Sequence, residues 1–178
     1  MFRNVSNTLI GSNTLCLNEM HRFCKEKKIK SKIWFKDIDE DVIKLSKRFV
    51  EKLSKRNFSH PLILISGGET TVKIKGKGKG GRNQEFALHF IKQMKKKNPL
   101  SKFFLLSAGT DGRDGPTDAA GGIVNNNSIE QIKLKNLNLE KELEINNSYQ
   151  VLKKINSLVI IKGTNTNVAD IQLLMLVK

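Results

Sequence analysis

Apolar residues in the first third of the chain follow two spacings, one typical of helices and the other of buried strands. Residues 14–28 and 37–55 carry apolar side chains three and four positions apart, with polar residues between them. Between these two segments, residues 29–35 read as a short strand. The pattern therefore predicts a helix, a strand and a second helix, the alternation found in α/β domains with parallel strands.

The remainder of the chain continues this alternation. Strands are predicted at four segments, 61–66, 70–74, 103–107 and 171–177. Helical patterns occupy 83–97 and 134–143, and residues 151–161 predict a helix followed by a strand. Loops rich in glycine or threonine follow three of the strands, at 67–68, 109–122 and 163–170. Because α/β sheets bind ligands outside the carboxyl ends of their strands, we expect a ligand site where these loops meet.

Composition places the chain among globular proteins of about one domain. Its 178 residues are 38% hydrophobic, which is enough for a core. The formal net charge of +15 would suit a nucleic-acid partner, but the excess is nearly all lysine spread along the chain. Arginine, which reads bases through bidentate hydrogen bonds, is scarce. We therefore expect a solvated basic surface and no nucleic-acid partner.

The cysteines and the hydropathy profile indicate the compartment. Cys16 and Cys24 have no second pair with which to form a disulfide framework or a zinc site. No apolar run approaches the ~20 residues that cross a membrane. The N-terminal residues also lack the continuous apolar segment of a signal peptide. We expect a soluble, cytoplasmic protein with reduced thiols and no membrane partner.

Three polar segments carry residues suited to binding and catalysis, and the first is SGGETT at 66–71. Its two glycines let the backbone turn and approach a ligand closely, with N–H groups free to face an anion. Glu69 adds a carboxylate beside two threonine hydroxyls. The same residues also fit a tight turn with a capping acid, so this alternative stays open.

The second segment, KGKGKGGRNQE at 75–85, combines four glycines with lysines and Arg82. It is not a Walker A loop, because Arg82 stands where that motif has lysine and no serine or threonine follows. We expect a mobile loop that binds phosphate or carboxylate, with the arginine fork at a helix start adding bidentate hydrogen bonds. The alternative is a flexible basic hairpin tip.

The third segment, AGTDGRDGPTDAAG at 108–121, places Asp111, Asp114 and Asp118 within eight residues. Clustered carboxylates after a strand suit Mg²⁺, which takes oxygen ligands and retains water and substrate phosphates. Asp111 or Asp114 could equally act as a base toward a substrate hydroxyl. An EF-hand is excluded, because its glutamate at loop position 12 is missing. A series of Asx-turns uses the same residue types and stays open.

These segments resemble, in order and spacing, the motifs of one family. SGGETTV (66–72), GKGKGGRNQEFAL (76–88) and AGTDGRDGPTDAAGGIV (108–124) are similar to the signature stretches of the MOFRL domain. This domain forms the C-terminal part of class II glycerate kinases. IGSN (10–13), NNSYQVL (146–152) and TNVAD (166–170) extend the resemblance over nearly the whole chain.

The resemblance implies an α/β fold with two parts. Residues 57–178 would form a three-layer α/β/α MOFRL domain. Residues 1–56 would be the terminal βα fragment of the family's Rossmann-like N-terminal domain. Since the family's active site lies between its two domains, this chain would need a separately encoded N-terminal domain, or self-association, to complete the cleft.

The resemblance also implies a reaction, the transfer of the γ-phosphoryl group of ATP to the 2-hydroxyl of D-glycerate with Mg²⁺. Catalysis would fall to Arg82, Glu69, Asp111 and Asp114, and metal binding to Asp111, Asp114 and Asp118. The residues expected to bind substrate or phosphate are, in chain order, Ser66, Gly67, Gly68, Thr70, Lys77, Gly80, Gly81, Asn83, Gln84, Glu85, Thr110, Thr164, Thr166 and Asn167.

Two departures from the family pattern support an alternative. The last loop typically reads TGxTGTNVND, whereas this chain has the shorter KGTNTNVAD at 162–170. An Asn-Asp pair expected near position 147 is Asn146-Asn147, which loses a carboxylate. The alternative to a kinase fragment is therefore a noncatalytic remnant that binds a small anionic ligand or is structural. Some family members carry the name hydroxypyruvate reductase. The sequence does not support this activity, because no G-x-G-x-x-G motif for NAD binding follows a predicted strand.

Overall fold

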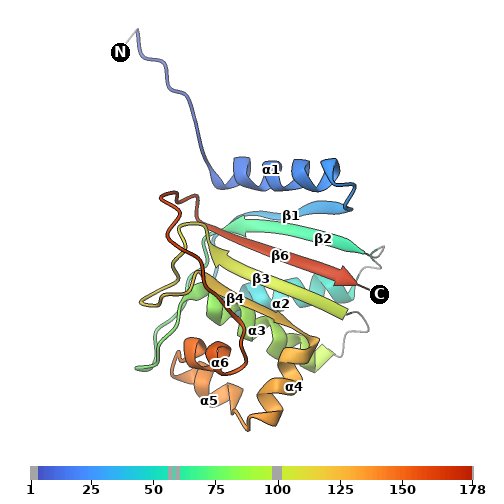
Figure 1. The fold of residues 1–178 in the computed structure, drawn as a ribbon, viewed down its shortest axis with the longest axis vertical. Helices are drawn as coiled ribbons and strands as arrows, with labels where there is room; N and C mark the ends of the chain where they lie inside the picture. The colour runs from blue at the N-terminus through green and yellow to red at the C-terminus, as the bar shows by residue number, and fades with distance from the viewer. Residues whose placement is uncertain (1–3, 56–57, 59–60, 98–101, 178) are drawn as a thin grey trace.

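The computed structural model describes residues 4–55, 58, 61–97 and 102–177. Its strands form one six-stranded sheet in the order β1-β2-β6-β3-β4-β5 (Figure 1). The strands are β1 (Ser31–Ile38), β2 (Leu62–Gly68), β3 (Lys102–Gly109), β4 (Gly121–Asn125), β5 (Leu158–Val159) and β6 (Asp170–Val177). The helices are α1 (Asn13–Glu26), α2 (Val42–Ser54), α3 (Arg82–Lys97), α4 (Asn126–Leu134), α5 (Leu139–Glu144) and α6 (Ser148–Lys154).

The sheet is mixed, and its strand directions determine where the loops meet. β1 and β2 are parallel, as the βα alternation predicts, whereas the other four strand pairs are antiparallel. β6 lies between β2 and β3 and runs against both. In this register Asp170, the first residue of β6, lies opposite Gly68 on one side and Gly109 on the other. The ends of β2 and β3 and the start of β6 therefore share one edge.

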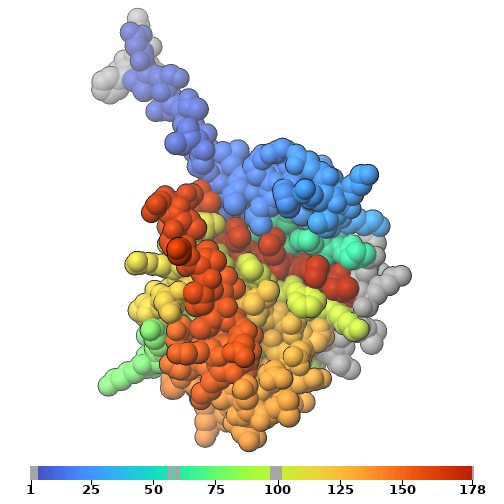
Figure 2. All heavy atoms as spheres, in the orientation of Figure 1, coloured from blue at the N-terminus to red at the C-terminus, as the bar shows by residue number. Residues whose placement is uncertain are grey.

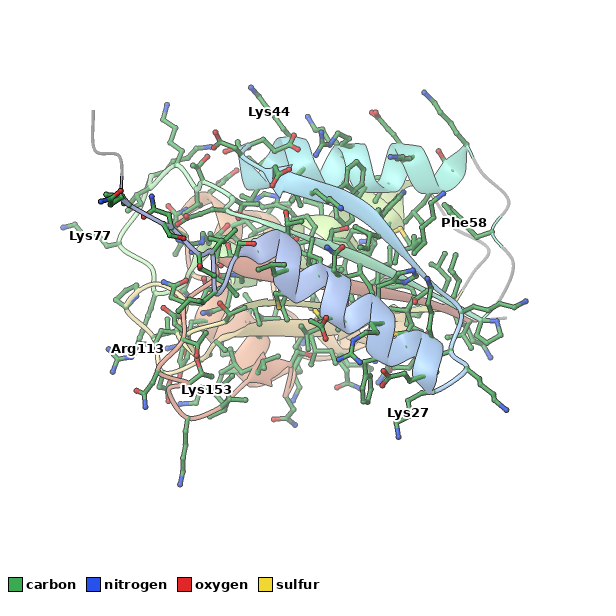
Figure 3. All side chains as sticks on the ribbon, turned by 90° about the horizontal axis from the view of Figure 1, so that it is seen from above. Lys27, Lys44, Phe58, Lys77, Arg113 and Lys153 are labelled. Atoms are coloured by element: carbon green, nitrogen blue, oxygen red, sulfur yellow. The ribbon has the colours of Figure 1, made fainter. Side chains whose placement is uncertain are left out.

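Helices lie on both faces of the sheet, which confirms the predicted α/β fold. On one face the described helix is α1, which precedes the predicted 57–178 domain, and the other helices share the opposite face. α1 lies on one side of β1 and α2 on the other (Figure 3). Neighbouring residues of β1 accordingly point to opposite faces, because side chains alternate along a strand. Ile33 packs with Leu17 of α1, whereas Trp34 packs edge-on against Phe49 of α2 with ring centroids 4.7 Å apart. The larger hydrophobic core lies on the α2–α3 face.

The start of α2 shows how local sequence fixes a helix at this edge. The Asp41 side chain accepts hydrogen bonds from the backbone N–H of Ile43 (2.9 Å) and of Lys44 (3.3 Å). These N–H groups have no partner within the helix, so the cap stabilises its first turn. Leu45 and Phe49, four residues apart on the same face, are fully buried in the core. The helix is thus positioned by its cap and by its apolar face.

Three details of the secondary structure differ from the sequence prediction. The predicted strand at 70–74 is wrong, because this segment joins the fold through a single bridge between Thr71 and Asp41. β4 was not predicted, since its two glycines precede only two residues with strand character, Ile123 and Val124. The predicted helix at 134–143 is wrong as one element. It spans parts of α4 and α5, which are separated by a turn in which Asn136 has a left-handed φ of 51°.

Residues on both sides of the predicted boundary near residue 56 contribute to the sheet. β1 precedes that boundary and pairs in parallel with β2, which follows it. Asn13 at the start of α1 also donates hydrogen bonds to the backbone carbonyls of Val168 (2.8 Å) and Asp170 (2.9 Å). The two predicted parts are therefore in intimate contact, and their assignment to separate domains stays a prediction.

Candidate functional site

The predicted ligand-binding segments meet at the edge of the sheet where β2 and β3 end. Residues 69–72 follow β2, the loop at 110–120 follows β3, and the loop at 160–169 leads into β6. Beside them begins α3 with Arg82. A hollow of about 530 Å³ opens here, lined by Asp39, Glu69, Thr70, Thr71, Val72 and Arg82.

Arg82 is bound on both sides by carboxylates. Its Nε donates to Oδ2 of Asp170 (2.7 Å) and its Nη2 to Oδ1 (3.0 Å), while Nη1 lies 3.0 Å from Oε1 of Glu69. The Asp170 side chain is fully buried, whereas 34% of the Arg82 side chain is exposed. The hydrogen bonds that Arg82 donates to Asp170 raise the pKa of Arg82 above its ordinary value. The bidentate fork expected to bind a substrate anion is thus engaged by a residue that the sequence analysis did not select.

Asp114 caps the start of α3. Its carboxylate accepts hydrogen bonds from the backbone N–H of Asn83 (3.1 Å) and of Gln84 (2.9 Å). Asn83 in turn accepts a hydrogen bond from the Ser107 hydroxyl (2.6 Å), which connects the cap to β3. Burial raises the pKa of Asp114 from 3.8 to about 6, although both backbone donors act in the opposite direction. This geometry explains why α3 begins where it does.

The raised pKa makes a prediction for stability. Between pH 4 and 6 the folded state binds a proton at Asp114 that the unfolded state has lost, so stability falls as pH rises through this window. The loss amounts to roughly 3 kcal/mol, from about 1.4 kcal/mol per pKa unit. Asp114→Asn does not titrate. We expect the difference in unfolding free energy between wild type and Asp114→Asn, measured by urea denaturation at each pH, to decline across this window. A difference independent of pH would contradict the assignment.

The three aspartates of the third segment do not gather into one cluster. Asp114 is buried in its capping role, whereas Oδ1 of Asp111 accepts from the backbone N–H of Arg113 (3.0 Å), which closes an Asx-turn. Asp118 accepts a hydrogen bond from the Tyr149 hydroxyl (2.7 Å), which lowers the pKa of Asp118. Within the described ranges, no three His, Cys, Asp or Glu side chains are placed to hold a metal. Metal binding by individual aspartates stays a prediction.

The glycine-rich loop is hydrogen-bonded to residues 145–149, and its expected mobility stays a prediction. The Gly78 N–H donates to the carbonyl of Ile145 (2.7 Å), and Lys79 accepts from the Tyr149 N–H (2.9 Å). Asn146 accepts from the Lys75 N–H (2.6 Å), and its neighbour Asn147 accepts from the Lys79 N–H (3.2 Å). The asparagine pair that departs from the family pattern therefore fastens this loop.

Gly80 and Gly81 are required by packing within this arrangement. A Cβ on Gly81 would collide with the backbone and carboxyl group of Asp114, and one on Gly80 would collide with the Ser148 hydroxyl. Lys77, by contrast, is exposed and extends away from the body of the molecule (Figure 3). The glycines thus allow close contact between protein segments, in addition to any ligand that they accommodate.

The last polar loop lies against the loop that follows β3. The Thr164 hydroxyl donates to the carbonyl of Thr110 (2.5 Å), and the Thr110 hydroxyl donates to the carbonyl of Ala169 (2.7 Å). Thr166 and Asn167 stay within the loop: the Thr166 N–H donates to the Thr164 hydroxyl (3.3 Å), and Asn167 accepts from the Ala169 N–H (2.9 Å). The hydroxyls of Thr110 and Thr164 thus join the two loops, and the binding of substrate or phosphate by Thr110, Thr164, Thr166 and Asn167 stays a prediction.

A buried polar layer lies beneath this edge, and sequence reasoning found only part of it. Ser66 of β2, Gln172 of β6 and Ser107 of β3 are paired in register across three strands, and all three are buried. Ser66 and Thr70 hydroxyls, and both side-chain polar atoms of Gln172, have no hydrogen-bond partner among the described residues. The sequence did contain a signal for this layer. Asp170 and Gln172 are two residues apart at the start of an apolar strand, so their polar side chains point to the same face of the sheet.

Within the segment RNQE only Arg82 lines the hollow, and Glu85 faces a different environment from Asn83 and Gln84. Gln84 donates from Nε2 to the Thr117 hydroxyl (3.0 Å) and so stays with the Asp114 cap. Glu85 lies on another side of α3, with Oε2 3.6 Å from Nε2 of His89. The segment RNQE therefore serves two separate environments, one at the sheet edge and one between α2, α3 and α5.

Known proteins share these sequence and structural features. The model of the MOFRL family matches residues 62–170, which include all three motif segments. The chain belongs to the MOFRL family. Glycerate 2-kinase of Pyrococcus horikoshii is 37% identical to it over 174 residues, which cover 94% of this chain and 39% of the relative. D-glycerate 2-kinase of Thermotoga maritima is 38% identical over 174 residues, covering 94% and 41%.

Solved structures agree with the MOFRL assignment. The crystal structure of glycerate kinase from Thermotoga maritima has a TM-score of 0.90 and 36% identity, and the match covers 99% of this chain and 43% of that one. A Pyrococcus horikoshii crystal structure has a TM-score of 0.87 at 34% identity. The chain thus spans about two fifths of the length of these relatives and corresponds to their C-terminal part. No helix in the described part of the chain is long and apolar enough to cross a membrane.

Proposed function

We propose that this MOFRL chain is the C-terminal part of a cytoplasmic glycerate 2-kinase that transfers the γ-phosphoryl group of ATP to the 2-hydroxyl of D-glycerate. The observation that carries the proposal is the match of 94% of the chain to relatives named glycerate 2-kinase. The function of these relatives comes to this chain as a proposal, because it spans about two fifths of their length.

Phosphoryl transfer depends mainly on neutralising charge and aligning the reacting groups, and Arg82 can contribute to both. An arginine side chain has five N–H donors, of which three contact Asp170 and Glu69. The other two remain for a phosphate or carboxylate in the hollow that Arg82 lines. Asp170 fixes the guanidinium in place, so that binding an anion would cost little side-chain entropy.

The carboxylates at this edge suit Mg²⁺ carried by nucleotide phosphates better than Mg²⁺ held in a protein cage. Mg²⁺ commonly uses one or two carboxylates together with substrate phosphates and water. Glu69, with 63% of its side chain exposed, the half-buried Asp111 and the exposed Asp118 are accessible for that role although each already contacts a protein group, whereas Asp114 is buried. When bound, the ion would neutralise developing charge on the phosphates. Glu69 or Asp111 would alternatively accept the proton of the attacking hydroxyl.

The N-terminal segment supports the need for a further polypeptide. Residues 4–12 extend away from the body of the molecule (Figure 1 and Figure 2), and Val5, Leu9 and Ile10 are 63%, 72% and 95% exposed. Three exposed apolar side chains within six residues support a surface that a partner covers. We propose that a separately encoded N-terminal domain, or a second copy of this chain, covers this segment and completes the cleft.

One observation favours the noncatalytic alternative. Ala169, in the shortened last loop, has a left-handed φ of 64°, which is costly for a residue with a Cβ. Asn165 in the same loop has a φ of 56°, which asparagine tolerates better. A strained loop of this kind is consistent with a chain that no longer catalyses the reaction. An activity measurement separates the two proposals.

The test is release of ADP by the purified chain with MgATP and D-glycerate, alone and with the N-terminal part of the Thermotoga maritima enzyme. We expect activity in the complemented reaction and at least a 100-fold loss in Arg82→Lys, which keeps the charge but not the fork. Arg113→Lys is the matched control, because Arg113 is exposed and points away from the body (Figure 3). No activity in either mixture would overturn the kinase proposal and favour the remnant.

A further inference from the structure

A second cavity lies next to the hollow beside Arg82, and Val72 lines both. It has a volume of about 240 Å³ and is enclosed by α2, residues 72–75, α3 and the segment that includes α5. Its walls are apolar where Val42, Ile43, Val72 and Leu143 face it. Its polar lining consists of Asp41, Lys73, Lys75, Glu85, His89, Lys92, Glu140, Glu144 and Asn146.

Glu85 and His89 supply the buried polar groups of this cavity. The two residues are one helical turn apart on α3 and are 2% and 8% exposed. Oε1 of Glu85 is buried and has no hydrogen-bond partner in the part of the chain that the structure describes. The other oxygen lies 3.6 Å from Nε2 of His89, too far for a hydrogen bond. Since an unpaired buried carboxylate oxygen is costly, this site is built to receive a donor.

We propose that this cavity binds the adenine ring of a nucleotide. The edge of adenine presents an amino donor beside a ring-nitrogen acceptor, and Glu85 and His89 present the complementary acceptor and donor. A neutral imidazole carries one N–H donor, so this pairing requires no charge on His89. The apolar side chains from α2, residue 72 and α5 would contact the two faces of the ring. A base with a carbonyl at that edge would place two acceptors together and lose the pairing.

The position of the cavity supports a nucleotide that spans both sites. Val72 lines this cavity and also the hollow beside Arg82. Arg82 and Glu85 are three residues apart on α3 and therefore lie on neighbouring positions of its surface. The exposed Lys73 and Lys75 lie at the mouth, where they can neutralise phosphates. This inference rests on the proposed kinase function for its choice of nucleotide, but it concerns base recognition alone.

The test compares adenosine with inosine, which replaces the amino group with a carbonyl, in calorimetric titrations of the 178-residue chain. We expect adenosine to bind about 10- to 100-fold more tightly, the range for a hydrogen bond to a charged group. Glu85→Met and His89→Phe should each remove that preference. Glu144→Met is the matched control, because this glutamate is exposed at the mouth of the same cavity. Equal affinities for the two nucleosides, or equal losses in Glu85→Met and Glu144→Met, would overturn the proposal.

A second measurement protects the test against misfolded variants. Photolabelling of the wild-type chain with 8-azidoadenosine should modify residues 41–43, 72–75, 85–92 or 140–146, as mapped by mass spectrometry. Labelling outside these segments would overturn the proposal. Neither experiment needs turnover or phosphate, so a chain that never phosphorylates glycerate can still pass both. Conversely, a chain that is an active kinase but does not prefer adenosine over inosine would overturn this inference and would not contradict the proposed function.

Discussion

Replacing Arg82 with alanine is expected to lower the free energy of unfolding by about 3 kcal/mol, because it strands the fully buried carboxylate of Asp170 without its partner. This value lies at the low end for a broken buried ion pair, since a third of the Arg82 side chain is exposed and part of its charge is screened by solvent. Urea denaturation monitored by circular dichroism measures the loss directly. A chain of this size would lose about 6–12 °C in Tm.

Two further variants distinguish the loss of the Arg82–Asp170 ion pair from a general effect of shortening the arginine side chain. Glu69→Ala removes the exposed partner of Arg82 and should cost at most about 1 kcal/mol. Arg82→Met combined with Asp170→Leu removes both charges, so it should be more stable than Arg82→Met alone. If Arg82→Ala unfolds at the same urea concentration as wild type, the pair does not hold the fold. If it does destabilise the chain, an activity loss in this variant cannot be assigned to chemistry without a stability control.

Secondary structure was predictable where periodicity and capping agree. α2 combines an Asp41 cap with buried residues at helical spacing, and both signals are visible in the sequence. The apolar runs of β2 and β3 were equally clear. Prediction failed at 70–74, where alternation of residue types was not accompanied by a neighbouring strand with which to pair. A strand is a property of a pair of segments, so alternation in one of them is not sufficient.

The location of the site was predictable from the loops, whereas the partners of its residues were not. Strand direction brings Gly68, Gly109 and Asp170 together, and this register is a consequence of β6 lying between β2 and β3. A single sequence does not reveal that strand order. The pairing of Arg82 with Asp170, 88 residues later, was therefore invisible, and the arginine was interpreted as a free anion-binding group.

The composition of a loop also did not reveal whether it moves. Residues 75–81 contain four glycines interleaved with lysines. This composition suggested a mobile loop, because glycine permits many conformations. In the fold, the same glycines let the loop approach Ile145 and Asn146 so closely that a Cβ on Gly76 or Gly78 would collide with their backbone. Glycine is thus required there for contact. Distinguishing the two uses requires knowledge of the neighbouring segment. For the hydrogen bond that the Gly76 N–H donates to Asn146, that segment is 70 residues away in sequence.

Replacing Gly68 with alanine is expected to destabilise the chain by about 3–5 kcal/mol, which combines backbone strain with overpacking. Gly68 has a φ of 143°, a conformation that residues with a Cβ rarely adopt. A Cβ here would also lie within 3.0 Å of the backbone of Ile38, where β1 and β2 end side by side. Backbone atoms at a strand end cannot turn aside as a flexible side chain can. The substitution should therefore force β1 and β2 apart next to Glu69 and the hollow.

Gly163→Ala is the matched control for this prediction, because its added Cβ would meet nothing closer than the Asp111 carbonyl at 3.9 Å. Thermal unfolding of both variants checks the difference, with a Tm lower by about 6–20 °C for Gly68→Ala and nearly unchanged for Gly163→Ala. Equal Tm values would show that β1 shifts without cost and that the contact between Gly68 and Ile38 is dispensable. A selective loss would show that the close approach of β1 and β2, at the corner where residues 69–72 leave the sheet, holds the site together.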